Sequence, residues 1–161
     1  MIKRLLYIIT IHFMLLTIYF YYYKIYITVV PILIEDSKSI KITALQKGFN
    51  ISYEMAKAFF DAGTLTNFDP ILLASIAAVE SNFDLKAVSS KGYKSLMQTK
   101  EATMKYANVD ILKGSMELKY WYKRTNDIEK ALVHYNGGNN PPKVSYRYAQ
   151  RVISLYRQKA V

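Results

Sequence analysis

The segment DPILLASIAAVESNF, residues 69–83, decides the fold of this chain. Asp69 is a typical helix N-cap, and Pro70 suits the first helical position because its missing N–H would have no partner there. The residues that follow are apolar or small on nearly every side of a helix. Such a pattern predicts a central helix over residues 70–81 that other helices cover on most faces. The apolar run ends at one carboxylate, Glu80.

Helical periodicity extends outward from this segment in both directions. It predicts further helices over residues 52–61, 115–124, 127–135 and 145–158. Ser52 and Asp127 (or Asn126) are the expected N-caps, and Ala62-Gly63 is expected to end the first of these helices. Residues 95–106 are expected to form a loop that leads into a helix. Because no strand is predicted after residue 35, the expected fold class is all-α, in a domain of residues 50–161.

The N-terminal residues differ sharply from this domain. Residues 5–23, LLYIITIHFMLLTIYFYYY, contain no Asp, Glu, Lys or Arg. A helix of this length rises about 28 Å, close to the thickness of a hydrocarbon core. We therefore predict a membrane anchor over residues 1–34, with its span at about residues 5–23, followed by a linker over residues 35–49. A cleaved signal peptide is the competing interpretation, but no small-x-small cleavage motif follows the apolar run.

The orientation of the anchor rests on the residues that flank it. Lys3 and Arg4 precede the span, and a cluster of tyrosines, Tyr19 to Tyr23, lies at its far end. This arrangement indicates a cytoplasmic N-terminus and a domain on the cell-wall side of the membrane. Residues 25–34 contain Pro31 and are compatible with an extension of the span, an interfacial segment or a short extended stretch.

The composition limits the partners and cofactors of the domain. The formal net charge is +10, so anionic polymers are attracted to the chain. No nucleic-acid motif is present, which favours cell-wall polymer over nucleic acid as the partner. The chain contains no Cys, and its two histidines, His12 and His134, are far apart in the sequence. No metal site and no cofactor are therefore predicted.

The chemistry of Glu80 follows from its apolar surroundings. Burial raises the pKa of a carboxyl group, so such a glutamate can donate a proton to a leaving group and later take one back. Glycoside hydrolysis normally needs a second carboxylate. The candidates are Asp84, Glu101, Asp110 and Glu117, and none has a comparable apolar setting. Either the fold hides the partner, or the reaction needs one carboxyl group because a hydroxyl of the substrate attacks the anomeric carbon.

Several motifs that share one order and spacing carry a family resemblance. They are Asp69-Pro70-x-Leu72-Leu73, Glu80-Ser81-x-Phe83, Ala87-Val88-Ser89, Gly92, Leu96-Met97-Gln98, Thr103, His134-Tyr135-Asn136-Gly137-Gly138 and Tyr148-x-x-x-Val152. Together they resemble the catalytic domain of lytic transglycosylases of the soluble-lytic-transglycosylase type, which is related to goose-type lysozyme. The resemblance covers about residues 50–158, nearly all of the chain that follows the predicted anchor and linker.

This resemblance implies a lysozyme-like helical fold and a reaction on peptidoglycan. The implied enzyme cleaves the β-1,4 bond between N-acetylmuramic acid and N-acetylglucosamine and forms 1,6-anhydromuramyl ends, with Glu80 as its single acid and base. Matching positions imply six substrate-binding residues. Ser81 would form a hydrogen bond near Glu80 or to the N-acetyl group of the substrate. Met97 and Gln98 would line the saccharide groove, and Tyr135 and Asn136 would face the glutamate and the sugar. Tyr148 would orient Glu80.

The chain departs from the family pattern at four positions near these motifs. Ser95 replaces the second glycine of the loop, Glu101 replaces a proline, and His134 and Gly137 replace alanines. A side chain at Ser95 is expected to reshape the groove, since that loop needs a close approach of the backbone. We also consider Tyr93 and His134 as substrate contacts that are particular to this chain.

Two alternative functions remain open from the sequence. The first is a lysozyme that hydrolyses the same bond with water on the same scaffold. The second is a non-catalytic module that binds glycan strands and anchors a wall-spanning assembly, although a pure binder has no need of the proton donor Glu80. A membrane-anchored enzyme of this size is suited to local opening of the wall for a secretion, conjugation or phage assembly.

Overall fold

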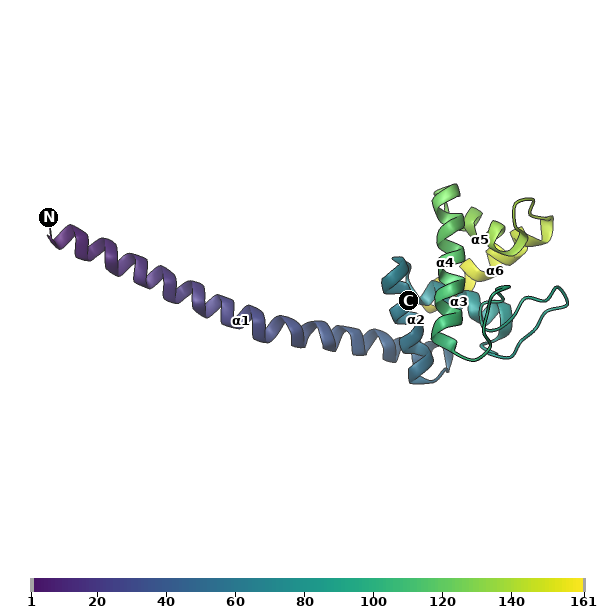
Figure 1. Cartoon of the computed structure of the whole chain (residues 1–161), viewed down its shortest axis with the longest axis horizontal. Helices are drawn as coiled ribbons and strands as arrows, with labels where there is room; N and C mark the ends of the chain where they lie inside the picture. Colours follow the sequence, from purple (N-terminus) through teal and green to yellow (C-terminus); the bar gives the residue numbers. More distant parts are fainter. Residues whose placement is uncertain (1, 161) are drawn as a thin grey trace. The chain divides into compact units, whose positions relative to one another are not determined.

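Six helices in chain order make up the protein in the computed structural model, which describes residues 2–160 apart from the side chains of residues 2–6, 8 and 9 (Figure 1). They are α1 (Ile2–Phe49), α2 (Tyr53–Thr66), α3 (Pro70–Ser81), α4 (Ala107–Thr125), α5 (Ile128–Gly137) and α6 (Lys143–Lys159). Within the described residues there is no strand, only isolated bridges of Lys94 with Val88 and Thr99. The all-α prediction is confirmed.

Helix α1 runs without interruption through residues 25–34, and it contains Pro31. The chain divides into two compact units, residues 1–40 and 41–161. Within Thr10–Phe49, an 18-residue stretch with a mean hydropathy of 1.4 is long and apolar enough to cross a membrane. The side chains of Lys3 and Arg4, on which the predicted orientation rests, lie outside the described residues.

The predicted linker over residues 35–49 is the C-terminal part of α1, and from Lys41 onward it belongs to the second compact unit. Ile42 and Leu45 are 1% and 3% exposed and join the hydrophobic core of that unit. They are three residues apart, so they lie on one face of the helix. Most of their neighbours in the sequence are polar, so the sequence pattern does not indicate that these two residues are buried. The core therefore begins before residue 50.

We expect Ile42→Ala to lower the free energy of unfolding of the domain by about 3 kcal/mol, because it opens a cavity in the core. The measurement is denaturation of the full chain in detergent, followed by the fluorescence of Trp121, the single tryptophan. Ile40→Ala is the matched control, since Ile40 is 68% exposed. Equal stability of the two variants would show that α1 does not contribute to the core.

The predicted N-caps are confirmed at three helices. Side chains of Ser52, Asp69 and Asp127 accept hydrogen bonds from backbone N–H groups at 3.2, 2.9 and 3.1 Å. The expectation that Ala62-Gly63 ends the first domain helix is wrong, because α2 continues to Thr66. Gly63 is needed inside the helix, since a Cβ atom there would lie 2.7 Å from the Phe68 carbonyl oxygen.

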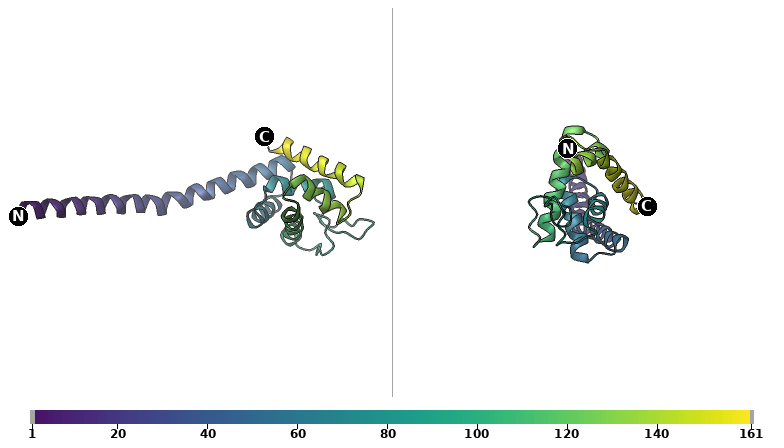
Figure 2. Two further views of the ribbon diagram at one scale, coloured as in Figure 1. Left: turned by 90° about the horizontal axis from the view of Figure 1, so that it is seen from above. Right: turned by 90° about the vertical axis from the view of Figure 1, so that its right-hand side faces the viewer.

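Helix α3 is the central element, as predicted, and its residues 72–77 are buried. Helices α2 and α6 pack against it, while α4 packs against α2 and α5, and α5 packs against α6. Figure 2 shows these helices end-on and from the side, with the long loop between α3 and α4 at one end of the domain. Glu80 belongs to the last turn of α3, where the chain enters this loop.

Candidate active site

The loop over residues 82–106 is held in place by one buried carboxylate, Asp110 in the first turn of α4. Asp110 accepts hydrogen bonds from the Ser95 hydroxyl (2.8 Å) and from Thr103 N and Met104 N (2.6 and 2.9 Å). Burial by itself would raise the pKa of this carboxyl, but the hydrogen bonds from Thr103, Ser95 and Met104 outweigh burial and lower its pKa below the usual value. Asp110 therefore stays charged and fixes the shape of the loop.

Ser81 and the Leu96-Met97-Gln98 segment join α3 to this loop. The Ser81 hydroxyl lies 2.9 Å from the Leu96 carbonyl oxygen, to which it donates a hydrogen bond. The Met97 side chain is buried and packs so tightly on α4 that a Cβ atom at Gly114 would lie 2.6 Å from the Met97 Cβ. Gln98 Nε2 donates to the Ser95 carbonyl oxygen at 2.9 Å.

Helices α5 and α6 bring the other predicted residues to the same end of α3. Tyr135 is buried, and its hydroxyl donates to the Met97 carbonyl oxygen at 2.7 Å. Asn136 is exposed, and its Oδ1 accepts from the Ser145 hydroxyl at 2.9 Å, which leaves its amide nitrogen available as a donor. Tyr148 on α6 is also buried.

Glu80 is partly buried among these side chains. Burial is the main cause that raises the pKa of its carboxyl to about 7. The Tyr148 hydroxyl and the Arg151 guanidinium lower this pKa, while the Glu117 carboxylate raises it. In the described part of the chain, the buried Tyr148 hydroxyl faces Glu80 without reaching the geometry of a regular hydrogen bond. Close to neutral pH, Glu80 can therefore both donate and accept a proton.

Glu80 lines two adjoining cavities, and a third cavity adjoins one of them. The Glu80 cavity, of about 430 Å³, is lined by Glu80, Ser89, Ser90, Lys91, Tyr93, Gln98, Tyr135, Asn136, Gly137, Gly138, Pro142 and Val144. The arginine cavity, also of about 430 Å³, shares Glu80, Asn136 and Val144 with it and adds Val79, Arg147, Tyr148 and Arg151. A third cavity meets the Glu80 cavity at Tyr93. This series of cavities suits a polymer that lies across the domain.

The structure brings most of the predicted site residues together. Glu80, Gln98, Tyr135 and Asn136 line the Glu80 cavity, and Tyr148 lines the arginine cavity. Ser81 and Met97 line neither of them. The Ser81 hydroxyl bonds to the loop backbone, and Met97 contributes its carbonyl oxygen to Tyr135 while its side chain fills the core.

Two of the four positions that depart from the family pattern, Ser95 and His134, have structural contacts. Ser95 has a positive φ of 67° and is fully buried, with its hydroxyl on Asp110. His134 stacks on Trp121 with ring centres 5.0 Å apart, and its Nδ1 lies 2.8 Å from the Gly138 carbonyl oxygen. Neither side chain lines the Glu80 cavity. Tyr93 does line it, so a substrate contact at that position stays a prediction.

Sequence reasoning missed two charged residues of the site, Arg147 and Arg151, and did not single out Glu117 among its candidate carboxylates. The two arginines are four residues apart on α6, on either side of Tyr148, and that spacing could have indicated a shared face. Glu117 was one of several equal candidates for a second carboxylate, because nothing in its local sequence shows that its charge acts on Glu80. Within the described residues, no group of three or more His, Asp or Glu side chains could hold a metal ion.

Comparison with known proteins adds one finding to this geometry. A family model described as the Transglycosylase SLT domain matches residues 57–153, more than half of the 161-residue chain. The matched segment contains Glu80 and the other residues that surround it in α3, α5 and α6. No solved structure matches the chain.

Proposed function

Because the chain belongs to the transglycosylase SLT domain family, a family of lytic transglycosylases that act on peptidoglycan, we propose which bond it cleaves and how. The substrate bond is the β-1,4 linkage between N-acetylmuramic acid and N-acetylglucosamine. Glu80 is the single acid and base, and the products are a 1,6-anhydromuramyl end and a free N-acetylglucosamine end. The observation that carries this proposal is one partly buried carboxyl, with a pKa of about 7, in the middle of a series of cavities.

The reaction needs two proton transfers at Glu80. In the first, the Glu80 carboxyl donates its proton to the oxygen of the scissile bond as the bond to the anomeric carbon breaks. In the second, the resulting carboxylate takes the proton of the C6 hydroxyl of the muramic sugar, whose oxygen attacks the same carbon. The carboxyl is regenerated and no water is consumed, so one carboxyl group suffices.

The residues around Glu80 support these steps in different ways. Burial and the charge of Glu80 raise the pKa of the Tyr135 and Tyr148 hydroxyls, so both stay neutral donors. Tyr148 faces Glu80 and orients it, while Tyr135 holds the Met97 carbonyl and thereby the Gln98 segment. The amide nitrogen of Asn136 donates to a sugar oxygen in the Glu80 cavity, which is supported by its position in the lining and by the bond of Ser145 to its Oδ1.

The test is product analysis with the full chain in detergent and purified peptidoglycan. Mass spectrometry distinguishes anhydro ends from reducing ends, because an anhydro product lacks the mass of one water. Anhydro ends would support the proposal. Reducing ends would mean a hydrolysing lysozyme, and binding without any release would mean a glycan-binding module.

The rate should depend on pH through the protonation of Glu80. Bond cleavage begins with the protonated carboxyl, so we expect the rate to fall as pH rises through about 7, by about tenfold per unit well above it. Arg151→Gln should move this fall to higher pH, because Arg151 lowers the pKa of Glu80. The measurement is the initial rate of product release from pH 5 to 9, with strand binding recorded at each pH. A rate that stays level from pH 7 to 9 would contradict the role of Glu80 as the acid.

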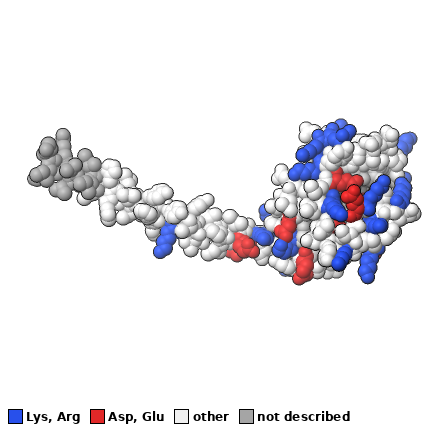
Figure 3. Space-filling view, in the orientation of Figure 1, with Lys and Arg blue, Asp and Glu red and all other residues white. Residues whose placement is uncertain are grey.

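We also propose that α1 anchors the enzyme in a membrane with the domain on the cell-wall side. The apolar stretch within Thr10–Phe49 and the peptidoglycan substrate of the family support this placement. Lys and Arg side chains outnumber Asp and Glu side chains on the face of the domain drawn in Figure 3. A basic surface favours association with the anionic wall.

A further inference from the structure

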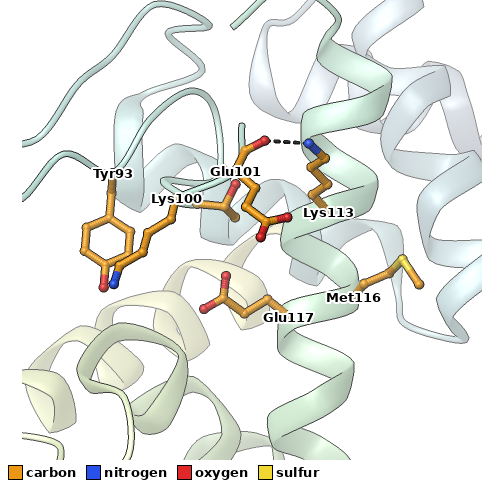
Figure 4. Close-up of a pocket in the computed structure, with 7 residues that line it drawn as sticks. Tyr93, Lys100, Glu101, Lys113, Met116 and Glu117 are labelled. Carbon is orange, nitrogen blue, oxygen red and sulfur yellow. Dashed lines mark hydrogen bonds between the residues drawn. The ribbon is translucent and has the colours of Figure 1, made fainter. Parts of the chain in front are cut away.

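A third cavity, of about 450 Å³, meets the Glu80 cavity at Tyr93 and has no part in the proton transfers above. We call it the Glu117 cavity. The loop and α4 line it, with Tyr93, Thr99, Lys100, Glu101, Lys113, Met116 and Glu117. In Figure 4 the side chains of Glu101 and Glu117 point into the space between the loop and α4, while Met116 points away from it. The cavity thus has a polar lining of two acids and two bases.

One buried polar group in this lining lacks a partner. Thr99 is 4% exposed, and its Oγ1 has no hydrogen-bond partner in the described part of the chain. An unsatisfied buried hydroxyl costs about 1–3 kcal/mol, and a molecule bound beside it, such as water, an ion or a ligand, removes this cost. Thr99 therefore points to a ligand independently of the charges around it.

The four charged side chains are also not paired with one another. No ion pair joins any of them among the residues that the structure describes, where the only salt bridge is on α2. The Lys113 ammonium donates to the backbone carbonyl oxygen of Glu101, and the Lys100 ammonium lies 5.6 Å from the centre of the Tyr93 ring. Burial, the largest effect, raises the pKa of the Glu117 carboxyl, the charge of Lys100 lowers it, and the charge of Glu101 raises it again. Glu117 is thus a partly buried acid without a fixed counter-ion.

The combination of charges identifies the chemistry of the ligand. A lining that contains unpaired carboxylate and ammonium side chains is complementary to a ligand that carries both an ammonium and a carboxylate. The sugars of a glycan strand carry hydroxyl and N-acetyl groups, whereas the peptides attached to a peptidoglycan strand end in amino and carboxyl groups. The Glu117 cavity adjoins the Glu80 cavity at Tyr93, so a peptide on a strand held in the Glu80 cavity has a neighbouring cavity to enter.

We propose that the Glu117 cavity binds the zwitterionic end of a peptide carried by the glycan strand. Its ammonium group is held by Glu101 and Glu117, and its carboxylate is held by Lys113. The unpaired Thr99 hydroxyl forms a hydrogen bond with the same zwitterionic end. This assignment rests on the proposed function, since the adjoining Glu80 cavity must hold the strand that carries the peptide.

The test compares two forms of one substrate: peptidoglycan strands with free peptide amino groups, and the same strands after N-acetylation. We expect kcat/KM of the full chain in detergent to be about tenfold higher on the free-amino strands, as for one charged hydrogen bond. Glu117→Gln should bring this ratio close to one. Because both rates are measured at one pH, any effect of Glu117 on the pKa of Glu80 cancels in the ratio.

Two further variants make the result decisive. Glu129→Gln is the matched control, because Glu129 is exposed in the first turn of α5, and this variant should keep the wild-type ratio. Glu101→Gln changes an exposed side chain and should also reduce the ratio. This variant therefore tests the proposal even if Glu117→Gln does not fold. Equal rates of wild type on both substrates would overturn the proposal, and so would a Glu117→Gln variant that folds and keeps the full preference.

A binding assay separates failure of this inference from failure of the proposed function. Co-sedimentation of the full chain with the two insoluble substrates needs no turnover. If no anhydro product forms but the chain still prefers free-amino strands in a Glu117-dependent manner, the proposed function fails and the peptide site stands. If anhydro products form and binding is equal on both substrates, the proposed function stands and the peptide site fails.

Discussion

Glu80→Gln should reduce the release of anhydromuropeptides by about a thousandfold, within the range that general acid–base catalysis contributes. Glutamine has nearly the same shape as glutamate, so it should leave the groove intact, but it has no proton to give to the scissile oxygen. Among the residues that the structure describes, no other carboxyl lines either the Glu80 cavity or the arginine cavity. The measurement is the initial rate of product release by the full chain, with Glu129→Gln as a control that changes an exposed glutamate.

The stability of this variant separates catalysis from folding. The pKa of Glu80 is raised from 4.5 to about 7 in the folded domain, so the folded state holds this proton more tightly than the unfolded state. The resulting contribution to stability is full below pH 4.5 and is lost as pH rises through 7. Glu80→Gln does not suffer this loss and should have the higher melting temperature at pH 8. An inactive variant with a lower melting temperature at pH 8 would point to misfolding rather than to loss of the acid.

Asp110→Ala should lower the free energy of unfolding by about 4 kcal/mol, because it removes the acceptor of several buried hydrogen bonds at once. The Ser95 hydroxyl and the N–H groups of Thr103 and Met104 would lose their partner inside the domain. The loop would then no longer hold Gln98 in place, so activity should fall together with stability. Denaturation of the full chain, followed by Trp121 fluorescence, measures the first effect.

A graded variant tests whether the hydrogen bonds cause this loss. Asp110→Asn keeps one acceptor oxygen but turns an NH₂ group toward donors, so its stability should lie between those of wild type and Asp110→Ala. Folding lowers the pKa of Asp110, so its ionised carboxylate stabilises the folded state at neutral pH. This contribution to the free energy of unfolding is lost as pH falls through the lowered pKa. The gap between wild type and Asp110→Ala should therefore narrow in acid. A gap that is constant from pH 7 to 2 would contradict the assignment.

Local signals predicted most of the helical frame, although α4 begins at Ala107 and the predicted helix over residues 115–124 covers only its second half. The caps Ser52, Asp69 and Asp127 act within a few residues of their own position, so their sequence context is sufficient. The all-round apolar character of residues 71–79 likewise predicted a central helix. The contribution of Ile42 and Leu45 to the core was missed, because a short apolar face in a polar segment has meaning only when its packing partner is known.

The site was predicted less completely than the helices, because the sequence does not show where side chains point. Motif order indicated which residues gather around Glu80, but it could not show where their side chains point. Ser81 and Met97 turn toward the loop and the core, and Ser95 turns toward Asp110. Glu117 lies in a helix whose relation to α3 is a property of the tertiary fold, so its influence on Glu80 could not be inferred from the sequence.

The burial of Ile42 and Leu45 has a consequence for the biosynthesis of the enzyme. A processing protease that removed the apolar segment before Lys41 would release a domain with its core complete. Cleavage in the polar stretch just after Leu45 would instead take two core side chains away with the discarded peptide. Cuts upstream of Lys41 would therefore release a domain with its core intact, whereas a cut just after Leu45 would release a destabilised one.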